Sequence, residues 1–316
     1  MKMMLLLLLA ASAGAQETVD REIVRLETTL KTLEAAPDAL PKDVLSLFEA
    51  HRAALERAKK APSPEYRLYR LRDAFVGVET LAFMARHKVA SVAEFETLWK
   101  QNAARFEKSS AEARGSVLQR ALVESSATRA GRLYRASLPY ARASAPWSGV
   151  YYLGEAEGNL RFRDFVQSIA DAKQEPAPSQ ERVTAMYKAL ERDTLTFFST
   201  DATNQQVVPV SVRLKETREL LDAGRIAGAT LLLVEARAAL SRRGGPKGTY
   251  PAEAAKRTGS IATMLQGWAD DEQAPMSGAL RDEVVPFHGA LFLEGATAPR
   301  ARAAQVTVTL VRWPYT

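Results

Sequence analysis

Between residues 128 and 165 the chain alternates arginines with aromatic residues in a spacing that could bind a ligand. Arg129, Arg132 and Arg135 recur every three residues, so on a helix they stay within about a third of its circumference. Aromatic residues follow them, and we take three as candidate binding residues: Trp147, Tyr151 and Tyr152. Guanidinium groups and aromatic rings together suit anionic or sugar-bearing ligands, or a protein partner. Buried tyrosines ringed by arginines that extend to solvent would give the same pattern, so both interpretations stay open.

One glutamate in this segment is a candidate catalytic acid. Glu155 stands in an aromatic setting formed by Trp147, Tyr151, Tyr152 and Phe162. Glycoside hydrolysis uses a pair of carboxylates, and all-helical enzymes that act on the cell wall exist. A cell-wall-acting enzyme with Glu155 as its general acid is therefore one alternative function.

Other catalytic signatures are missing from the sequence. The three histidines, His51, His87 and His288, are far apart and form no metal-binding motif, and there is no cysteine. We expect His51 and His87 on solvent-facing sides of helices. The glycine-rich loop at 244–248 lacks the spacing of a phosphate-binding loop, and no nucleophile elbow occurs. We therefore expect no metal and no cofactor, and we favour a non-catalytic protein.

The first fifteen residues have the pattern of a secretory signal peptide. Lys2 precedes an apolar run with leucine at every position from 5 to 9, and the segment ends Ser12-Ala13-Gly14-Ala15. Small residues at this spacing are typical of a cleavage site, so we expect cleavage after Ala15 and a mature chain that begins at Gln16. The apolar run is well short of the ~20 residues that span a bilayer. This pattern predicts a periplasmic or secreted protein without a transmembrane anchor.

The charge balance is weakly basic. The formal net charge is +6 and the isoelectric point is near 9.5, which allows attraction to anionic polymers or membranes of the envelope. The chain is rich in alanine and arginine, as in GC-rich bacteria. We expect no nucleic-acid partner, because nucleic acid is scarce outside the cytoplasm.

Apolar residues recur at helical spacing almost throughout the chain. Ile23, Leu26, Leu30 and Leu33 form one such stripe, and Ser91 with Glu94 predicts a capping box before the next helix. The fold class that this predicts is mainly α, a multi-helix bundle or an α-solenoid of helical hairpins. The proline-rich stretch 174–180 suggests a linker, which would separate a helical region 16–173 from another at 181–299.

The chain ends differently, in residues 300–316. Gln305 to Arg312 alternates apolar residues with threonine, which predicts a short C-terminal β-strand. A single strand needs a partner. Residues 207–212 offer one within the chain, although Pro209 weakens it. The other candidate is a strand of another protein.

Two short stretches resemble parts of a tetratricopeptide repeat. Tyr152-Leu153-Gly154 with Pro178 is similar to its leucine-glycine pair and its closing proline. Gly224, Ala229 and Ala236 are similar to its second half. Val166 and Lys173 stand where the family has small residues. The resemblance implies a concave helical surface that binds peptides or proteins, without catalysis.

These observations favour an exported bacterial helical protein with a scaffold or interaction role. It would bind a protein or an envelope polymer through its helical surface, or through the strand at 305–312. A second alternative to this role, besides the enzyme, is a carrier of a small apolar ligand. Its cavity would be lined by Phe197, Phe198 and residues 231–234. The oligomeric state stays open.

Overall fold

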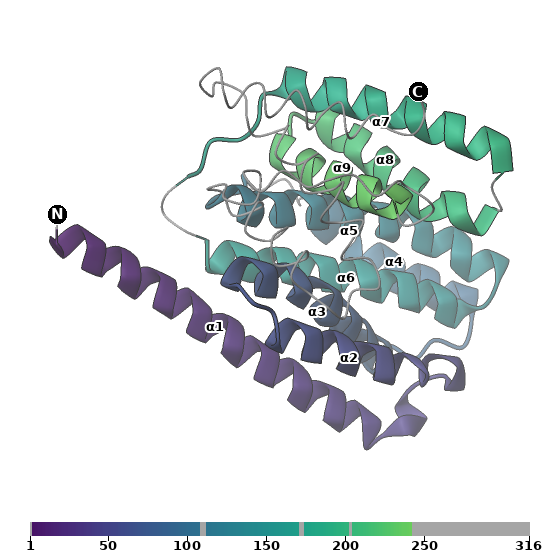
Figure 1. Ribbon diagram of the computed structural model, residues 1–316. Helices are drawn as coiled ribbons and strands as arrows, with labels where there is room; N and C mark the ends of the chain where they lie inside the picture. Colours follow the sequence, from purple (N-terminus) through teal and green to yellow (C-terminus); the bar gives the residue numbers. More distant parts are fainter. Residues whose placement is uncertain (1, 108–111, 171–173, 202–203, 242–316) are drawn as a thin grey trace. The chain divides into compact units, whose positions relative to one another are not determined.

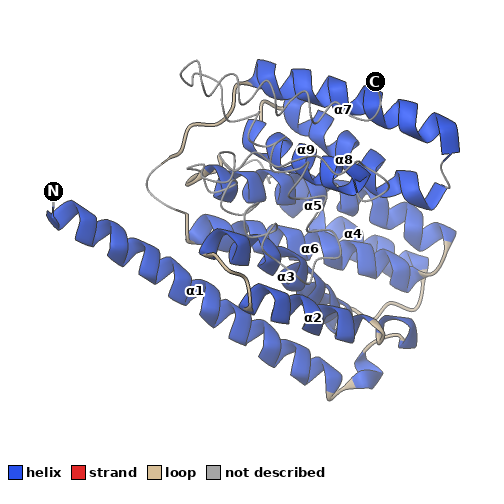
Figure 2. Ribbon diagram, in the orientation of Figure 1, coloured by secondary structure: helices blue, strands red, loops and turns tan. Residues whose placement is uncertain are grey.

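The computed structural model describes residues 2–107, 112–170, 174–201 and 204–241. Within these ranges the chain forms nine α-helices and no strand (Figure 2). The expectation of a mainly α fold is therefore confirmed for this part. The expected strand at 305–312 and the whole tail after residue 241 lie outside the described residues.

The helices follow one another with short connections. Their bounds are α1 Lys2–Glu34, α2 Leu47–Lys59, α3 Pro64–Arg86, α4 Val92–Glu107, α5 Val117–Ala143, α6 Pro146–Ser168, α7 Gln180–Asp201, α8 Asn204–Asp222 and α9 Ile226–Ser241. Two 3₁₀ turns, η1 (Pro37–Ala39) and η2 (Lys42–Val44), connect α1 to α2. In the described part of the chain, no helix combines the length and apolarity needed to cross a membrane.

The residues group into two compact units. Unit 1 comprises 1–114 and 126–171, and unit 2 comprises 115–125 and 172–316. Helix α5 therefore belongs to unit 2 over its first turns and to unit 1 over the rest. Each unit is described by itself below.

In unit 1 the closest helix pair is α3 with α6, and α1 and α2 pack beside α3 (Figure 1). Small residues on α6 permit this close approach. A Cβ atom added to Gly158 would lie 2.9 Å from the carbonyl oxygen of Val76 on α3, so the backbones are nearly in contact. Leucines of both helices are fully buried, among them Leu71, Leu81, Leu153 and Leu160.

Two helix starts follow their sequence signals. The Ser63 hydroxyl accepts a hydrogen bond from the Tyr66 amide at 3.1 Å, with Pro64 in the first turn of α3. At the start of α4, the Ser91 hydroxyl accepts from the Glu94 amide at 3.2 Å. The Glu94 carboxylate in turn accepts from the Ala90 amide at 2.9 Å. The expected cap at Ser91 is confirmed, and the reciprocal bond falls one residue earlier than in the usual capping box.

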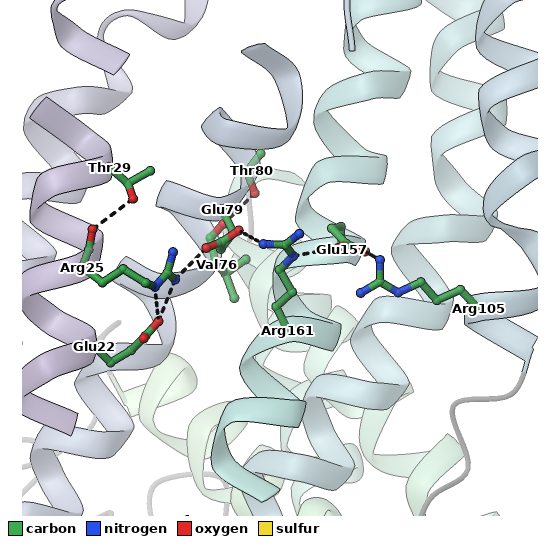
Figure 3. A network of polar contacts seen from close by, with 9 residues as sticks. All are labelled: Glu22, Arg25, Thr29, Val76, Glu79, Thr80, Arg105, Glu157 and Arg161. Carbon is green, nitrogen blue, oxygen red and sulfur yellow. Dashed lines mark hydrogen bonds and ion pairs between the residues drawn. The ribbon is translucent and has the colours of Figure 1, made fainter. Parts of the chain in front are cut away.

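A network of buried charges ties four helices of unit 1 together (Figure 3). Glu79 on α3, whose side chain is 2% exposed, pairs with Arg25 of α1 at 2.7 Å and with Arg161 of α6 at 2.9 Å. Arg161 also holds the buried Glu157 at 2.8 Å, and Arg105 of α4 reaches Glu157 at 2.7 Å. Each buried carboxylate thus has two arginines, which offsets the desolvation of its charge.

Unit 2 is built around α9, which packs against α8 and α7. Every residue from 227 to 238 is buried. Gly224 has φ +70°, the left-handed conformation expected at the turn between α8 and α9. The Glu124 carboxylate, from the first turns of α5, accepts a hydrogen bond from the Gly228 amide at 2.6 Å. Burial raises the pKa of Glu124, while this bond and two nearby arginines oppose the rise.

One expectation about local structure is wrong. Residues 207–212, offered as a strand, lie inside α8, because Val210, Leu214, Thr217 and Leu221 repeat at helical spacing and are buried. Helix α5 contains Pro139 and continues to Ala143. In the first turn of α6, Pro146 occupies a position that needs no amide hydrogen.

Candidate binding surface

Helices α5 and α6 bring most of the sequence-predicted binding residues together within unit 1. Arg129 and Arg132 of α5 both act electrostatically on Glu155 of α6, and Arg132 also acts on Tyr152. We call this set, together with Arg135 and two further tyrosines, the aromatic–arginine surface: Arg129, Arg132, Arg135, Tyr140, Tyr151, Tyr152 and Glu155. The two helices are joined by two residues only, so these positions face one another across a hairpin.

A stacked tyrosine pair, partly exposed, forms the apolar part of this surface. The rings of Tyr140 and Tyr152 stack with centroids 4.0 Å apart and planes 19° apart, and Tyr140 is 45% exposed. Tyr151 meets Tyr152 edge to face at 5.6 Å. Burial, and then a hydrogen bond with Tyr140, raise the pKa of Tyr152 to about 12. The Tyr152 hydroxyl therefore stays protonated at neutral pH.

Tyr140 belongs to the alternating pattern but was not among the candidate binding residues. Tyr140 joins the surface because it stacks on Tyr152 across the hairpin, and little in the sequence predicts that contact. Tyr140 lies eight positions after Arg132, about two helical turns further along α5. That spacing is the one signal that could have placed it on the same face.

Glu155 is the half-buried acid of the surface. The Tyr151 hydroxyl donates to its carboxylate at 3.3 Å. Burial raises the pKa of Glu155, and the bond from Tyr151 and the charges of Arg129 and Arg132 oppose the rise. Burial likewise raises the pKa of Tyr151 well above its ordinary value. The pair therefore favours a protonated or hydrogen-bonded carboxyl over a solvated charge.

The remaining arginines and aromatic residues of this segment differ in their exposure to solvent. Arg135 is exposed, while Arg129 and Arg132 are half-buried. Tyr134, one of the aromatics of the pattern, is a core residue that stacks on Trp99 at 4.7 Å and accepts the indole N–H through its carbonyl at 3.0 Å. Trp147 lines a pocket with the residues after α1 and at the end of α3.

His51 and His87 are half-buried, less exposed than expected. His51 lies over Gly77, where no Cβ would fit, and burial lowers its pKa. His87 is half-buried and stacks on Phe83 at 4.3 Å. Among the residues that the structure describes, no group of three or more histidine or acidic side chains could hold a metal ion.

The structure describes only part of the lining of the cavity expected for an apolar ligand. Residues 231–234 are fully buried within α9, where helices α7 and α8 pack against them. The side chains of Phe197 and Phe198 lie outside the described residues. The carrier hypothesis therefore stays a prediction.

Comparison of the chain with models of protein families, with curated proteins and with solved structures finds no match. The resemblance to a tetratricopeptide repeat stays a prediction. Function has to be argued from the residues themselves.

Proposed function

We propose that this chain is an exported, non-catalytic protein that binds an acidic protein partner through its aromatic–arginine surface. The observation that carries the proposal is the stack of the exposed Tyr140 on the half-buried Tyr152, beside arginines of α5. Tyrosine and arginine are the residue types enriched where protein interfaces concentrate their binding energy. The weakly basic net charge of +6 adds a general attraction for acidic partners.

The exposure of a large apolar side chain supports the aromatic–arginine surface as the partner-binding surface. Among the residues whose side chains the structure describes, two large apolar side chains stand out as exposed, Val24 and Tyr140. Val24 is an isolated aliphatic on α1, and single exposed aliphatics are ordinary. Tyr140 has a stacked neighbour and cations at hand, so a partner's carboxylates and apolar groups could both be satisfied there.

Export rests on the leader at 1–15, and the compartment is part of the proposal. Within it, the partner could also be an anionic polymer of the envelope. An acidic protein fits better, because a two-tyrosine stack offers a compact apolar centre with a polar rim, as protein interfaces have. The strand expected at 305–312 is a second possible contact, by addition to a partner's sheet.

An enzyme that uses Glu155 is the second candidate function. The raised pKa of Glu155 favours it, because a general acid must be protonated at its working pH. Hydrolysis of a glycosidic bond also needs a second carboxylate. The nearby Glu157 is bound by Arg161 and Arg105, which makes it a poor partner for that chemistry.

The test is affinity capture of envelope proteins on the mature chain, residues 16–316, with a crosslinker placed at position 140. The double variant Tyr140→Ala/Arg135→Glu should lose the captured partner, at least about tenfold in yield, because it removes the apolar centre and reverses a charge. Arg57→Glu is the matched control, because Arg57 is also an exposed helical arginine of unit 1.

A partner that is retained by the double variant and lost on deletion of 305–316 would overturn the surface proposal in favour of the strand. Capture of a purified acidic polymer but of no protein would identify the partner as an anionic polymer of the envelope. Turnover of purified peptidoglycan that is abolished by Glu155→Gln would replace the binding role with the enzyme.

A further inference from the structure

A pocket in unit 1 lies beside the first turn of α6. It has a volume of about 220 Å³ and is lined by η1 with the residues after it, by the end of α3, and by Trp147 and Val150. Since a water molecule occupies ~30 Å³ in the liquid, the space equals roughly seven waters. It is smaller than the pockets of roughly 300–1,000 Å³ that take drug-sized ligands. The space therefore suits a single small ring, free or at the end of a longer molecule.

The walls of this pocket differ in character. Trp147, Met84 and Val150 provide apolar surface, and Asp38, His87 and Lys88 provide polar groups. A sugar ring has the matching division, with C–H groups on its faces and hydroxyls around its edge. An indole can cover such a face, and its N–H remains a donor. We propose that this pocket binds one sugar ring, with Trp147 against a ring face and the three polar residues at the hydroxyls.

The polar groups are suited to hydroxyls in particular. The His87 ring is fixed by its contact with Phe83 at 4.3 Å. Burial, followed by the charge of Arg86, lowers the pKa of His87, with Glu157 opposing. A neutral imidazole has one donor and one acceptor, and a hydroxyl can satisfy both.

Lys88 adds donors at the edge of the pocket. Its ammonium donates one hydrogen bond to the carbonyl oxygen of Asp38 at 3.2 Å. An ammonium carries three protons, so this bond holds it in place and leaves donors for a ligand. Lys88 also links the end of α3 to η1, which fixes two walls of the pocket relative to each other.

The pocket uses residues outside the aromatic–arginine surface, so this proposal does not rest on the proposed function. Either can fail alone. Where both hold, the chain would have a protein-binding surface on α5 and α6 and a sugar pocket at the first turn of α6.

Ligand-observed NMR on the mature chain tests the proposal, with glucose, N-acetylglucosamine and a β-linked tetrasaccharide of N-acetylglucosamine as probes. We expect at least one monosaccharide to show saturation transfer, with a dissociation constant in the millimolar range. Trp147→Ala should weaken this binding about tenfold or more, and Trp147→Phe should keep most of it because a ring face remains. Val24→Ala is the control, because Val24 is an exposed apolar residue of unit 1 that does not line the pocket.

Comparison of the monosaccharide with the tetrasaccharide shows whether the bound sugar ring is free or belongs to a polymer. Tetrasaccharide binding at least as tight as that of the monosaccharide indicates the end of a polymer, and binding of the monosaccharide alone indicates a free sugar. The proposal is overturned if no sugar binds, if Trp147→Ala binds as the wild type does while its thermal unfolding is unchanged, or if free amino acids bind in place of sugars.

Discussion

Glu155 is the residue whose charge state the fold controls most directly within the aromatic–arginine surface. Burial raises the pKa of this carboxyl in the folded state. At a pH between the pKa of the unfolded state and that of the folded state, the native state binds more protons than the unfolded state. The free energy of unfolding that this group contributes is therefore complete below the unfolded pKa, and it falls as pH rises through the folded pKa.

Replacing Glu155 with glutamine should consequently stabilise the protein at neutral pH. The amide oxygen can still accept from Tyr151, and no charge has to be buried. The gain should disappear in acid, below the ordinary carboxyl pKa, where the wild-type group is itself neutral. Urea unfolding of both proteins at neutral and acidic pH measures the difference.

A second tyrosine–glutamate pair supplies the control for this experiment. The Tyr187 hydroxyl donates to Glu191 at 2.6 Å, with the same spacing of four residues on α7. Glu191→Gln therefore reports what the exchange of a carboxylate acceptor for an amide does in this geometry. A loss of stability at neutral pH for Glu155→Gln beyond that of the control would contradict the prediction.

Most residues of the aromatic–arginine surface could be predicted from sequence, because they lie on two helices that form one hairpin. Arg129, Arg132, Tyr151 and Tyr152 belong to consecutive helices, and helical spacing is enough to bring them together. Trp147 shows where this reasoning ends. Its pocket needs the residues around Asp38 and Lys88, and no local pattern relates these segments to the start of α6.

At the scale of elements, the contact between α3 and α6 depends on the absence of a side chain at Gly158. A Cβ there would meet the Val76 carbonyl oxygen at 2.9 Å and the Val76 Cα at 3.1 Å. Backbone atoms cannot move aside cheaply, so Gly158→Ala should destabilise the protein by about 1–3 kcal/mol. Thermal or urea unfolding gives the value.

Gly131 is the matched control on α5. The nearest atom to its added Cβ is the Arg135 Nη1 at 3.5 Å, which is an ordinary contact. Alanine has the higher helix propensity, so Gly131→Ala should stabilise the protein by about 0.5–1 kcal/mol. Equal effects of the two substitutions would show that α3 and α6 are not in close contact.

The buried charges join elements in the same unit, and Arg161 is their centre. It holds two carboxylates whose side chains are 2% and 3% exposed, Glu79 and Glu157. Each acid keeps one other arginine when Arg161 is removed. We therefore expect Arg161→Ala to cost about 3 kcal/mol, near the low end for breaking a buried pair.

Arg52→Ala provides the comparison at an exposed pair. Arg52 pairs with Glu34 between α2 and α1, and its side chain is 56% exposed. Its removal should change the free energy of unfolding by less than about 1 kcal/mol. A similar cost for both arginines, measured by urea unfolding, would refute a stabilising role for the network.

Helices could be predicted from sequence more reliably than their ends. Apolar periodicity identified the helices from α1 to α9, because each must bury one face. Pro139 and Pro209 lie within helices, although proline interrupts the helical hydrogen-bond pattern. The charge network left no sequence signal, because its members come from four separate helices.

At the scale of the whole molecule, the question is whether residues 1–15, the expected leader, contribute to the fold. Helix α1 is continuous from Lys2 to Glu34, so the expected cleavage after Ala15 falls inside it. Four apolar side chains of α1 beyond that point are buried: Val19, Ile23, Leu26 and Leu30. Asp20 and Arg25 also follow it, and they hold α1 to α3 through Arg67 at 2.8 Å and Glu79 at 2.7 Å.

Removal of residues 1–15 should therefore leave these contacts of unit 1 in place. A chain expressed as 16–316 should unfold at the same temperature as the full chain, within about 2 °C. Mass spectrometry of the protein recovered from the periplasm or medium should give a mature chain that begins at Gln16. Val19→Ser/Ile23→Ser is the contrasting variant, because it removes apolar contacts just after the cleavage point and should lower that temperature clearly. A large loss of stability on removal of 1–15 alone would mean that the leader is part of the folded protein, and it would count against cleavage at this site.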